Sequence, residues 1–241
     1  NPCGSEAGGI PAVMNQLMPV LADNVPTVGY ASLKEQLEAH PVKNPEIVHP
    51  LDNPLYSKGL VVLRGNLADS SIARPMVMVG DNKTFVGPAK VFNGLEQAIE
   101  GVIKGKVQSG EVLVLRYEGP RGGPGVTDIF SLMGHLVGYG LGSDCAVVTD
   151  GKASGFCEGL YVVQVSPEAF VGGPLALVQD GDKIEINIPN SSLNLKISPA
   201  EMEKRKASWK ASEPRIKRGF LTVYHHLAKP VEKGGGINCR L

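Results

Sequence analysis

The sequence has no excess of charge of either sign, few cysteines and no long apolar run. Its 241 residues include 24 Lys and Arg and 24 Asp and Glu, which gives a formal net charge of zero. Nucleic acids and membrane surfaces both attract clustered positive charge, so this balance argues against either partner. No stretch approaches the roughly 18 consecutive apolar residues that identify a transmembrane helix. We therefore expect a globular protein that binds neither nucleic acid nor membrane.

The four cysteines, Cys3, Cys145, Cys157 and Cys239, are scattered and form no CxxC pair. Zinc sites and disulfide frameworks need characteristic spacings, so the sequence predicts neither. The expected location is a reducing compartment, either the cytoplasm or the matrix of a mitochondrion or plastid. The chain begins Asn-Pro-Cys, with neither an initiator Met nor the regions of a signal peptide, which favours a fragment or a processed product.

Proline and glycine divide the chain into three expected parts. We expect a helical N-terminal segment with a Pro-rich loop over residues 1–59, a barrel domain over 60–228 and a flexible tail over 229–241. Helical spacing and capping residues predict helices over 9–22, 32–40, 95–104, 129–141, 198–209 and a short one that opens at 166. Apolar runs predict strands at 60–63, 76–79, 84–86, 112–115, 145–148, 160–165, 175–178, 183–188 and 193–197. Because strict strand–helix alternation is not kept, the pattern favours a mixed α/β barrel with peripheral helices over a doubly wound sheet.

Two glycine-rich turns follow the central apolar runs, 112–115 and 145–148. The first turn, Glu118–Gly125, leads to Asp128, and the second, which begins at Asp150, leads to Ser154. Loops at the ends of strands are where a rigid scaffold usually presents its chemistry. We hypothesise that these two turns form one wall of an active site.

Each candidate residue also has a structural interpretation. A serine acts as a base or nucleophile only where its pKa is lowered, and the spacing alone favours a structural turn serine at 154. Asp128 suits the first turn of a helix as a capping residue, or Mg²⁺ as a hard oxygen ligand. The 118–125 turn is neither a P-loop nor GxGxxG; its glycines suit either an anion at a helix N-terminus or close backbone packing.

Five segments resemble one family in the same order: LDNPL, VLRGNLA, RYEGPRGGPG, TDGKASG and VSPEAFVGGPLALVQDGDKIEINIPN, which begin at residues 51, 62, 116, 149 and 165. From about Gly8 to about Leu227 the chain resembles the C-terminal domain of the iron–sulfur dehydratases that act on dihydroxy acids, phosphogluconate and sugar acids. It is most similar to the dihydroxy-acid dehydratases. The resemblance implies a swivelling β/β/α barrel.

The resemblance also implies a reaction, in which a 2,3-dihydroxy acid loses water and becomes a 2-keto acid, as in branched-chain amino-acid biosynthesis. It implies an iron–sulfur cluster and Mg²⁺, held mainly by a larger N-terminal domain outside this sequence, and a homodimer in the full-length form. The chain alone would then be inactive. Ser154 matches the serine proposed to take the C2 proton, and Asp128 matches a position, usually Glu, that completes the Mg²⁺ site. The expected substrate-binding residues are Gly123, Gly125, Lys152, Gly155 and Phe156.

Four positions depart from the family pattern: Asp128, Lys152, Phe156 and Cys157. Lys152 lacks the bidentate fork of the usual Arg, Phe156 replaces a small residue, and Asp128 is one methylene shorter than Glu. Two alternatives therefore stay open: a sugar-acid or phosphogluconate dehydratase, and a diverged binding domain that keeps the barrel without the chemistry.

Overall fold

The computed structural model describes residues 2–22, 24–55, 59–73, 84–153, 159–214 and 217–237, with the backbone only at Pro2 and Cys3. The chain divides into two compact units, Asn1–Ser57 and Lys58–Leu241. In the described residues no helix combines the length and the apolar character needed to cross a bilayer.

The first unit is a small group of helices: α1 (Pro2–Glu6), α2 (Gly9–Gln16), the 3₁₀ turn η1 (Met18–Val20) and α3 (Leu33–Glu38). The predicted helix over 9–22 is interrupted before Pro19, as a proline in the last turn requires. The predicted cap of α3 is confirmed, because the Ser32 hydroxyl accepts the N–H of Glu35 at 3.1 Å. Asn15 Nδ2 donates to the Leu37 carbonyl at 2.7 Å and ties α2 to α3.

The second unit is built on one eight-stranded sheet with the order β1-β2-β8-β6-β4-β3-β9-β10. The central pairs β3–β4, β4–β6 and β6–β8 are parallel, and the outer pairs are antiparallel. A bridge between Arg64 and Ser192 links the two ends of this order, so the sheet is nearly closed. The mixed α/β barrel is confirmed. The strands are β1 (Val61–Leu63), β2 (Ser70–Ala73), β3 (Thr84–Phe92), β4 (Val112–Leu115), β6 (Ala146–Thr149), β8 (Leu160–Ser166), β9 (Lys183–Asn187) and β10 (Ser192–Leu195).

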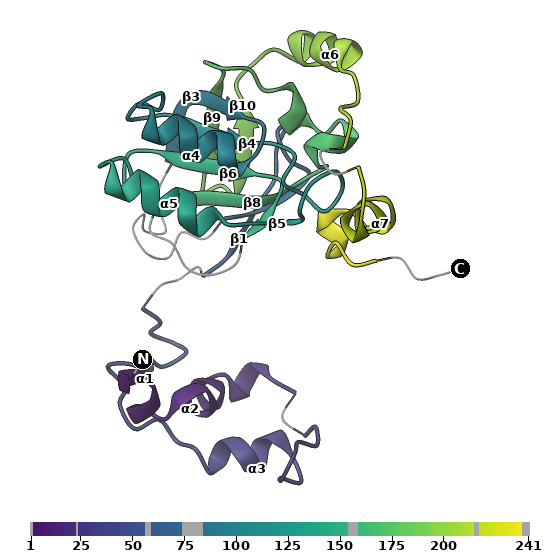
Figure 1. Ribbon diagram of the computed structural model, residues 1–241. Helices are drawn as coiled ribbons and strands as arrows, with labels where there is room; N and C mark the ends of the chain where they lie inside the picture. The colour runs from purple at the N-terminus through teal and green to yellow at the C-terminus, as the bar shows by residue number, and fades with distance from the viewer. Residues whose placement is uncertain are drawn as a thin grey trace. The chain divides into compact units, whose positions relative to one another are not determined.

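Alternating side chains of the parallel strands supply two separate cores. Val112 and Val114 of β4 point into the barrel with Val148 of β6, whereas Leu113 and Leu115 point outward. The outward set packs against α4 (Leu95–Ile103) and α5 (Ile129–Gly138), which lie side by side on one face of the sheet (Figure 1). Strands buried on both faces read as continuous apolar runs, which is why 112–115 was recognisable as a strand.

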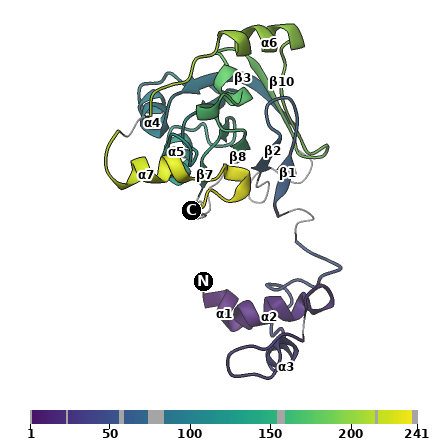
Figure 2. The ribbon, with the colours of Figure 1, turned by 90° about the vertical axis from the view of Figure 1, so that its right-hand side faces the viewer.

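Shorter elements complete the second unit. The two-residue strands β5 (Val126–Thr127) and β7 (Lys152–Ala153) pair in parallel as a separate small sheet. The helix α7 (Phe220–Leu227) lies beside β7 (Figure 2), and the 3₁₀ turn η4 (Val231–Lys233) follows it. The helix α6 (Pro199–Ser208) begins, as predicted, at a Ser198 cap that accepts the N–H of Glu201.

Two predicted elements are wrong. Residues 175–178 are not a strand, because Pro174–Leu177 forms the 3₁₀ turn η3 with Leu175, Ala176 and Leu177 buried. A short apolar run has no periodicity that separates a strand from a buried turn. The helix expected at 166 is only the 3₁₀ turn η2 (Ala169–Val171), and the Ser166 hydroxyl bonds the Glu232 carboxylate at 2.6 Å instead of capping. The predicted strand at 76–79 lies outside the described residues.

Candidate active site

The two glycine-rich turns meet at the small sheet. Val126 pairs with Lys152 and Thr127 with Ala153, and the Lys152 N–H donates to the Gly125 carbonyl at 3.0 Å. The chain continues from these paired residues to Asp128 on one strand and to Ser154 on the other. Ser154, Gly155 and Phe156 lie outside the described residues. The described ends of the two turns are therefore adjacent.

Close backbone packing explains two glycines of the first turn. A Cβ on Gly123 would lie 2.3 Å from the Tyr117 carbonyl oxygen, so only glycine fits there. Gly125 has a φ of 83° and lies against the hydroxyl of Tyr224 on α7. These two glycines therefore serve close backbone packing, which is one of the two roles expected for the turn. Gly123 also lines a cavity.

That cavity, of about 330 Å³, lies between the first turn and the N-terminus of α4. The residues that line it include Gly123, Thr127 and three acidic residues, Glu96, Glu118 and Asp128. The Thr127 hydroxyl is buried and has no hydrogen-bond partner among the described residues. The wall is acidic and, in its described part, contains no basic side chain. An anionic substrate would need a cation here.

Asp128 caps α5. Its Oδ1 accepts the N–H of Ser131 at 3.3 Å, and the side chain remains exposed at the cavity. The capping role is therefore confirmed. The carboxylate still presents oxygen toward solvent, as a hard-cation ligand must.

Glu118 supplies the N-terminal acceptor of α4. Its Oε1 accepts the N–H of Leu95 at 3.1 Å, although the carboxylate is buried. A negative charge at a helix N-terminus is stabilised by the unpaired N–H groups there. Asn93, just before α4, accepts a hydrogen bond from Arg116 Nε at 2.9 Å.

Asp150 is fully buried beneath both turns. Its carboxylate accepts N–H groups from Glu118 and Ala169 at 2.9 Å and from Tyr117 at 3.3 Å. Burial raises its pKa to about 6, in spite of these bonds, and the charge of Glu118 acts in the same direction as burial. Asp150 therefore anchors the start of the first turn to β6.

Glu168 is the second buried carboxylate. It accepts the N–H of Arg121 at 2.9 Å and that of Val231 at 2.7 Å, which joins the first turn to η4. Burial raises its pKa to about 7 against the effect of these two bonds.

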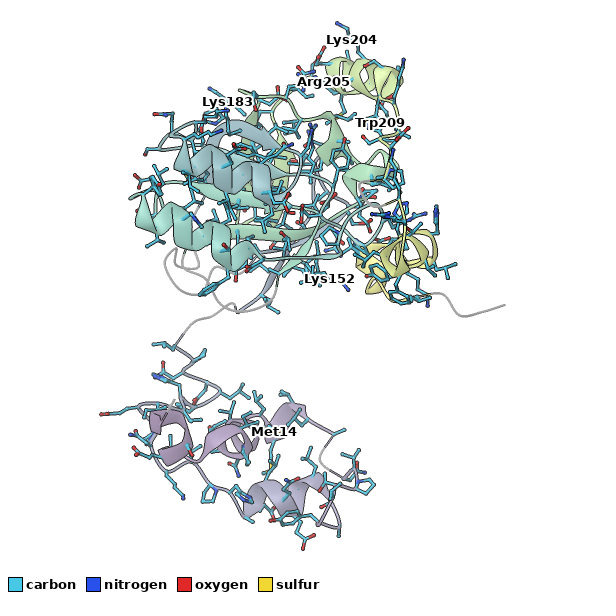
Figure 3. The ribbon with its side chains drawn as sticks, in the orientation of Figure 1. Met14, Lys152, Lys183, Lys204, Arg205 and Trp209 are labelled. Carbon is cyan, nitrogen blue, oxygen red and sulfur yellow. The ribbon has the colours of Figure 1, made fainter. Side chains whose placement is uncertain are left out.

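The C-terminal segment holds both turns. His225 Nδ1 accepts the N–H of Gly122, and burial, together with His226 and Arg121, lowers the pKa of this histidine. Lys152 Nζ donates to the Gly234 carbonyl on the side of the barrel where α7 lies (Figure 3). Residues 229–237 of the expected tail thus contact the barrel. Lys152 does not line the described cavity.

The described residues contain no group of three or more His, Cys, Asp or Glu side chains that could hold a metal ion. Asp128 offers hard oxygen that suits a share of a Mg²⁺ site, beside the unpartnered Thr127 hydroxyl. Cys145 does not suit an iron–sulfur cluster, because burial raises the pKa of its thiol and a cluster ligand is a thiolate.

The sequence reasoning missed the three residues that hold the turns, Asp150, Glu168 and His225. A signal was present for the first two. Asp150 comes directly after an apolar strand and before Gly151, and Glu168 follows one after Pro167, where solvent exposure is not expected. His225 lies on a helix that was not predicted.

Comparison with known proteins identifies the family. Residues 46–235 match the model described as dihydroxy-acid/6-phosphogluconate dehydratase C-terminal. The chain therefore belongs to the family of dihydroxy-acid and 6-phosphogluconate dehydratase C-terminal domains, as its motifs indicated.

The chain is similar to several curated dihydroxy-acid dehydratases. It is 41% identical to that of Lachnoclostridium phytofermentans over 235 residues, and 42% identical to that of Acetivibrio thermocellus over 233 residues. It is 42% identical to that of Clostridium beijerinckii over 235 residues. Each match covers 95% of this chain but 42% of the relative, so the chain spans less than half the length of these proteins.

Proposed function

We propose that this chain is the substrate-side domain of a hydro-lyase that converts a 2,3-dihydroxy acid into a 2-keto acid. The observation that carries the proposal is the parallel pairing of β5 with β7, which brings together the points where the chain continues to Asp128 and to Ser154. The 330 Å³ cavity at this point has room for a small acid.

In this proposal Ser154, as the alkoxide, takes the proton from C2 of the substrate while the C3 hydroxyl leaves as hydroxide. That proton and the hydroxide together make up the water that is released, and the serine returns to the alkoxide. The enol that results tautomerises to the 2-keto acid. Gly123 lines the cavity that binds the substrate, and Gly125, Lys152, Gly155 and Phe156, on the two turns beside it, complete the substrate site once the second domain is in place. Asp128 gives one carboxylate to Mg²⁺, and the acidic wall supports this assignment because a carboxylate substrate would otherwise be repelled.

The remaining ligands come from a second domain. An iron–sulfur cluster and Mg²⁺ supply Lewis-acid chemistry at the leaving hydroxyl and the substrate carboxylate when bound. The described residues offer no cluster ligands, and the relatives are more than twice as long as this chain, which supports an N-terminal domain that holds these groups. The chain alone is then inactive. The full-length protein is a homodimer, and it acts in a reducing compartment, either the cytoplasm or an organellar matrix.

The relatives named dihydroxy-acid dehydratase favour a branched 2,3-dihydroxy acid as substrate, whereas the family description also names 6-phosphogluconate. The described cavity wall favours the former, since a phosphate ester adds negative charge to an acidic wall.

The test is 2-keto acid formation by the full-length protein, anaerobically prepared, with each substrate in turn. Turnover of the branched dihydroxy acid at least about ten-fold above that of 6-phosphogluconate supports the proposal. The reverse preference assigns the protein to the phosphogluconate or sugar-acid group. A protein that contains neither iron nor acid-labile sulfide, and forms no keto acid, is a diverged binding domain.

A further inference from the structure

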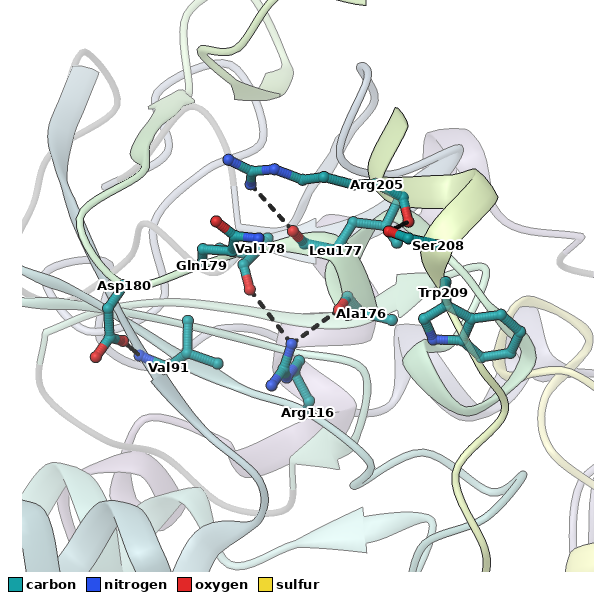
Figure 4. Close-up of a pocket in the computed structure, with 10 residues that line it drawn as sticks. All are labelled: Val91, Arg116, Ala176, Leu177, Val178, Gln179, Asp180, Arg205, Ser208 and Trp209. Atoms are coloured by element: carbon teal, nitrogen blue, oxygen red, sulfur yellow. Dashed lines mark hydrogen bonds between the residues drawn. The ribbon is translucent and has the colours of Figure 1, made fainter. Parts of the chain in front are cut away.

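A second cavity, of about 470 Å³, lies between η3, the 179–182 turn and the C-terminal end of α6 (Figure 4). It shares no lining residue with the candidate active site. Val91 and Leu177 supply apolar wall, and Arg116, Arg205 and Trp209 supply polar groups. Its size falls within the range of about 300–1,000 Å³ that is typical of small-molecule sites.

Arg116 brings to this cavity a guanidinium with no carboxylate as a hydrogen-bond partner among the described residues, although the charges of Asp150 and Asp180 act on it at longer range. Nε donates to Asn93 Oδ1 at 2.9 Å, and Nη1 donates to the carbonyls of Ala176 at 2.8 Å and Val178 at 3.3 Å. All these acceptors are neutral, and Arg116 forms no ion pair within the described part of the chain. Nη2 donates to none of the described residues.

The other charged groups at the cavity are all engaged in ion pairs, and Arg205 is shared by two carboxylates. Arg205 forms ion pairs with Asp182 and Glu201, and the second of these joins Nε to Oε1 at 2.8 Å. Asp180 pairs with Lys90 at 3.3 Å. These five groups sum to one negative charge, which offsets the charge of Arg116. Arg116 is therefore distinguished by having no direct ion pair among the described residues, and not by a net charge of the cavity.

Trp209 adds a second donor without a partner. Its indole N–H is buried and bonds to none of the described residues. Figure 4 shows the indole nitrogen on the edge of the ring that is turned toward Arg116. A buried donor without an acceptor costs free energy, so an acceptor at this point would be stabilising.

We propose that this cavity binds a small aliphatic monocarboxylate. The carboxylate lies between the Arg116 guanidinium and the Trp209 indole N–H, and the aliphatic part contacts Val91 and Leu177. The planar N–H groups of the guanidinium match a planar carboxylate, and a singly charged carboxylate places less negative charge beside Asp180 than a phosphate dianion does. The proposal does not depend on the dehydration reaction.

The test is ligand titration of the full-length protein labelled with 5-fluorotryptophan and followed by fluorine NMR. The resonance that disappears in Trp209→Phe belongs to Trp209. Butanoate should shift this resonance saturably, at a concentration about ten-fold lower than butanamide, which is equivalent to about 1.4 kcal/mol. Inorganic phosphate should bind more weakly than butanoate.

Gln179 provides variants that leave the fold intact, because this residue lines the cavity and is exposed. Gln179→Glu should weaken butanoate binding at least about three-fold, and Gln179→Lys should strengthen it by a similar factor. Each of the following results overturns the proposal: no saturable shift with butanoate, equal affinity for butanoate and butanamide, tighter binding of phosphate, or insensitivity to both Gln179 variants.

Discussion

Glu168 Oε1 accepts the backbone N–H of Val231 at a distance of 2.7 Å. This bond joins a carboxylate at the end of β8 to the segment after α7, and the other oxygen of the same carboxylate holds Arg121 in the first glycine turn. The turn and the C-terminal segment are thus fixed to one buried side chain. Loss of that side chain should loosen both.

At pH 4.5, Glu168→Gln should lower the free energy of unfolding by about 1–3 kcal/mol, because one acceptor is lost and an NH₂ group faces a buried N–H. Urea denaturation of the wild-type and variant proteins measures the difference. Asp69→Asn is the matched control, since Asp69 is exposed, and it should change the stability by less than about 0.5 kcal/mol. Equal effects of the two substitutions would contradict the anchoring role.

The raised pKa of Glu168 predicts how stability depends on pH. The folded value is about 7 against 4.5, so between these values the folded state binds more protons than the unfolded state. The contribution of Glu168 is then greatest below pH 4.5 and is lost as pH rises through 7. Asp150 acts in the same direction between 3.8 and about 6, whereas the lowered pKa of His225 removes stability as pH falls below 6.5.

The difference between wild type and Glu168→Gln isolates the Glu168 contribution, because Asp150 and His225 are present in both proteins. Their stability difference should change by at most about 3 kcal/mol between pH 4.5 and 8, with the wild type losing more as pH rises. Denaturant titrations across that range measure it. A difference that is constant with pH would show that Glu168 has the same pKa in both states.

Asp128→Ser separates the capping role of Asp128 from metal binding. Serine retains the acceptor for the Ser131 N–H, so stability should change by less than about 0.5 kcal/mol. The Mg²⁺ concentration for half-maximal turnover of the full-length enzyme should rise at least about ten-fold, as a hard anionic ligand is lost. Asp128→Glu, which keeps the carboxylate, is the control. An unchanged Mg²⁺ requirement in Asp128→Ser would leave Asp128 as a cap only.

Gly123→Ala should destabilise the first turn by about 1–3 kcal/mol and reduce turnover, because the new Cβ would lie 2.3 Å from a backbone oxygen. Gly134→Ala is the matched control. Gly134 lies within α5 with open space around it, so alanine there should stabilise by about 0.5–1 kcal/mol. Thermal unfolding and steady-state assays measure both. If Gly123→Ala changed neither the stability nor the turnover, the backbone of the turn would be able to shift and accept the added Cβ.

Local sequence patterns predicted more of the fold than of the candidate site. Val112–Leu115 was predicted to the residue because burial on both faces makes a continuous apolar run, and Ser198 was predicted because capping is local. The 174–177 turn has the same apolar texture as a strand, so only the tertiary packing distinguishes it. The order of the strands within the sheet depends on pairing between distant segments, so the sequence alone does not give it.

In the candidate site too, residues in local sequence patterns could be predicted and residues that depend on long-range contacts could not. Asp128 and Gly123 were found because a glycine turn after a buried strand is a local pattern, and both line the cavity. Asp150 and Glu168 were missed because their role lies in accepting N–H groups from segments 19 to 63 residues away. No spacing rule connects such partners. Burial at the end of a strand was the only available hint.

The measurement that tests the central claim most directly is the turnover of Ser154→Ala in the full-length enzyme, loaded with its metals. If the turns after β5 and β7 form the catalytic wall, turnover should fall at least about 100-fold, with iron, sulfide and Mg²⁺ contents unchanged. Turnover within a few-fold of wild type, at the same metal content, would contradict the account.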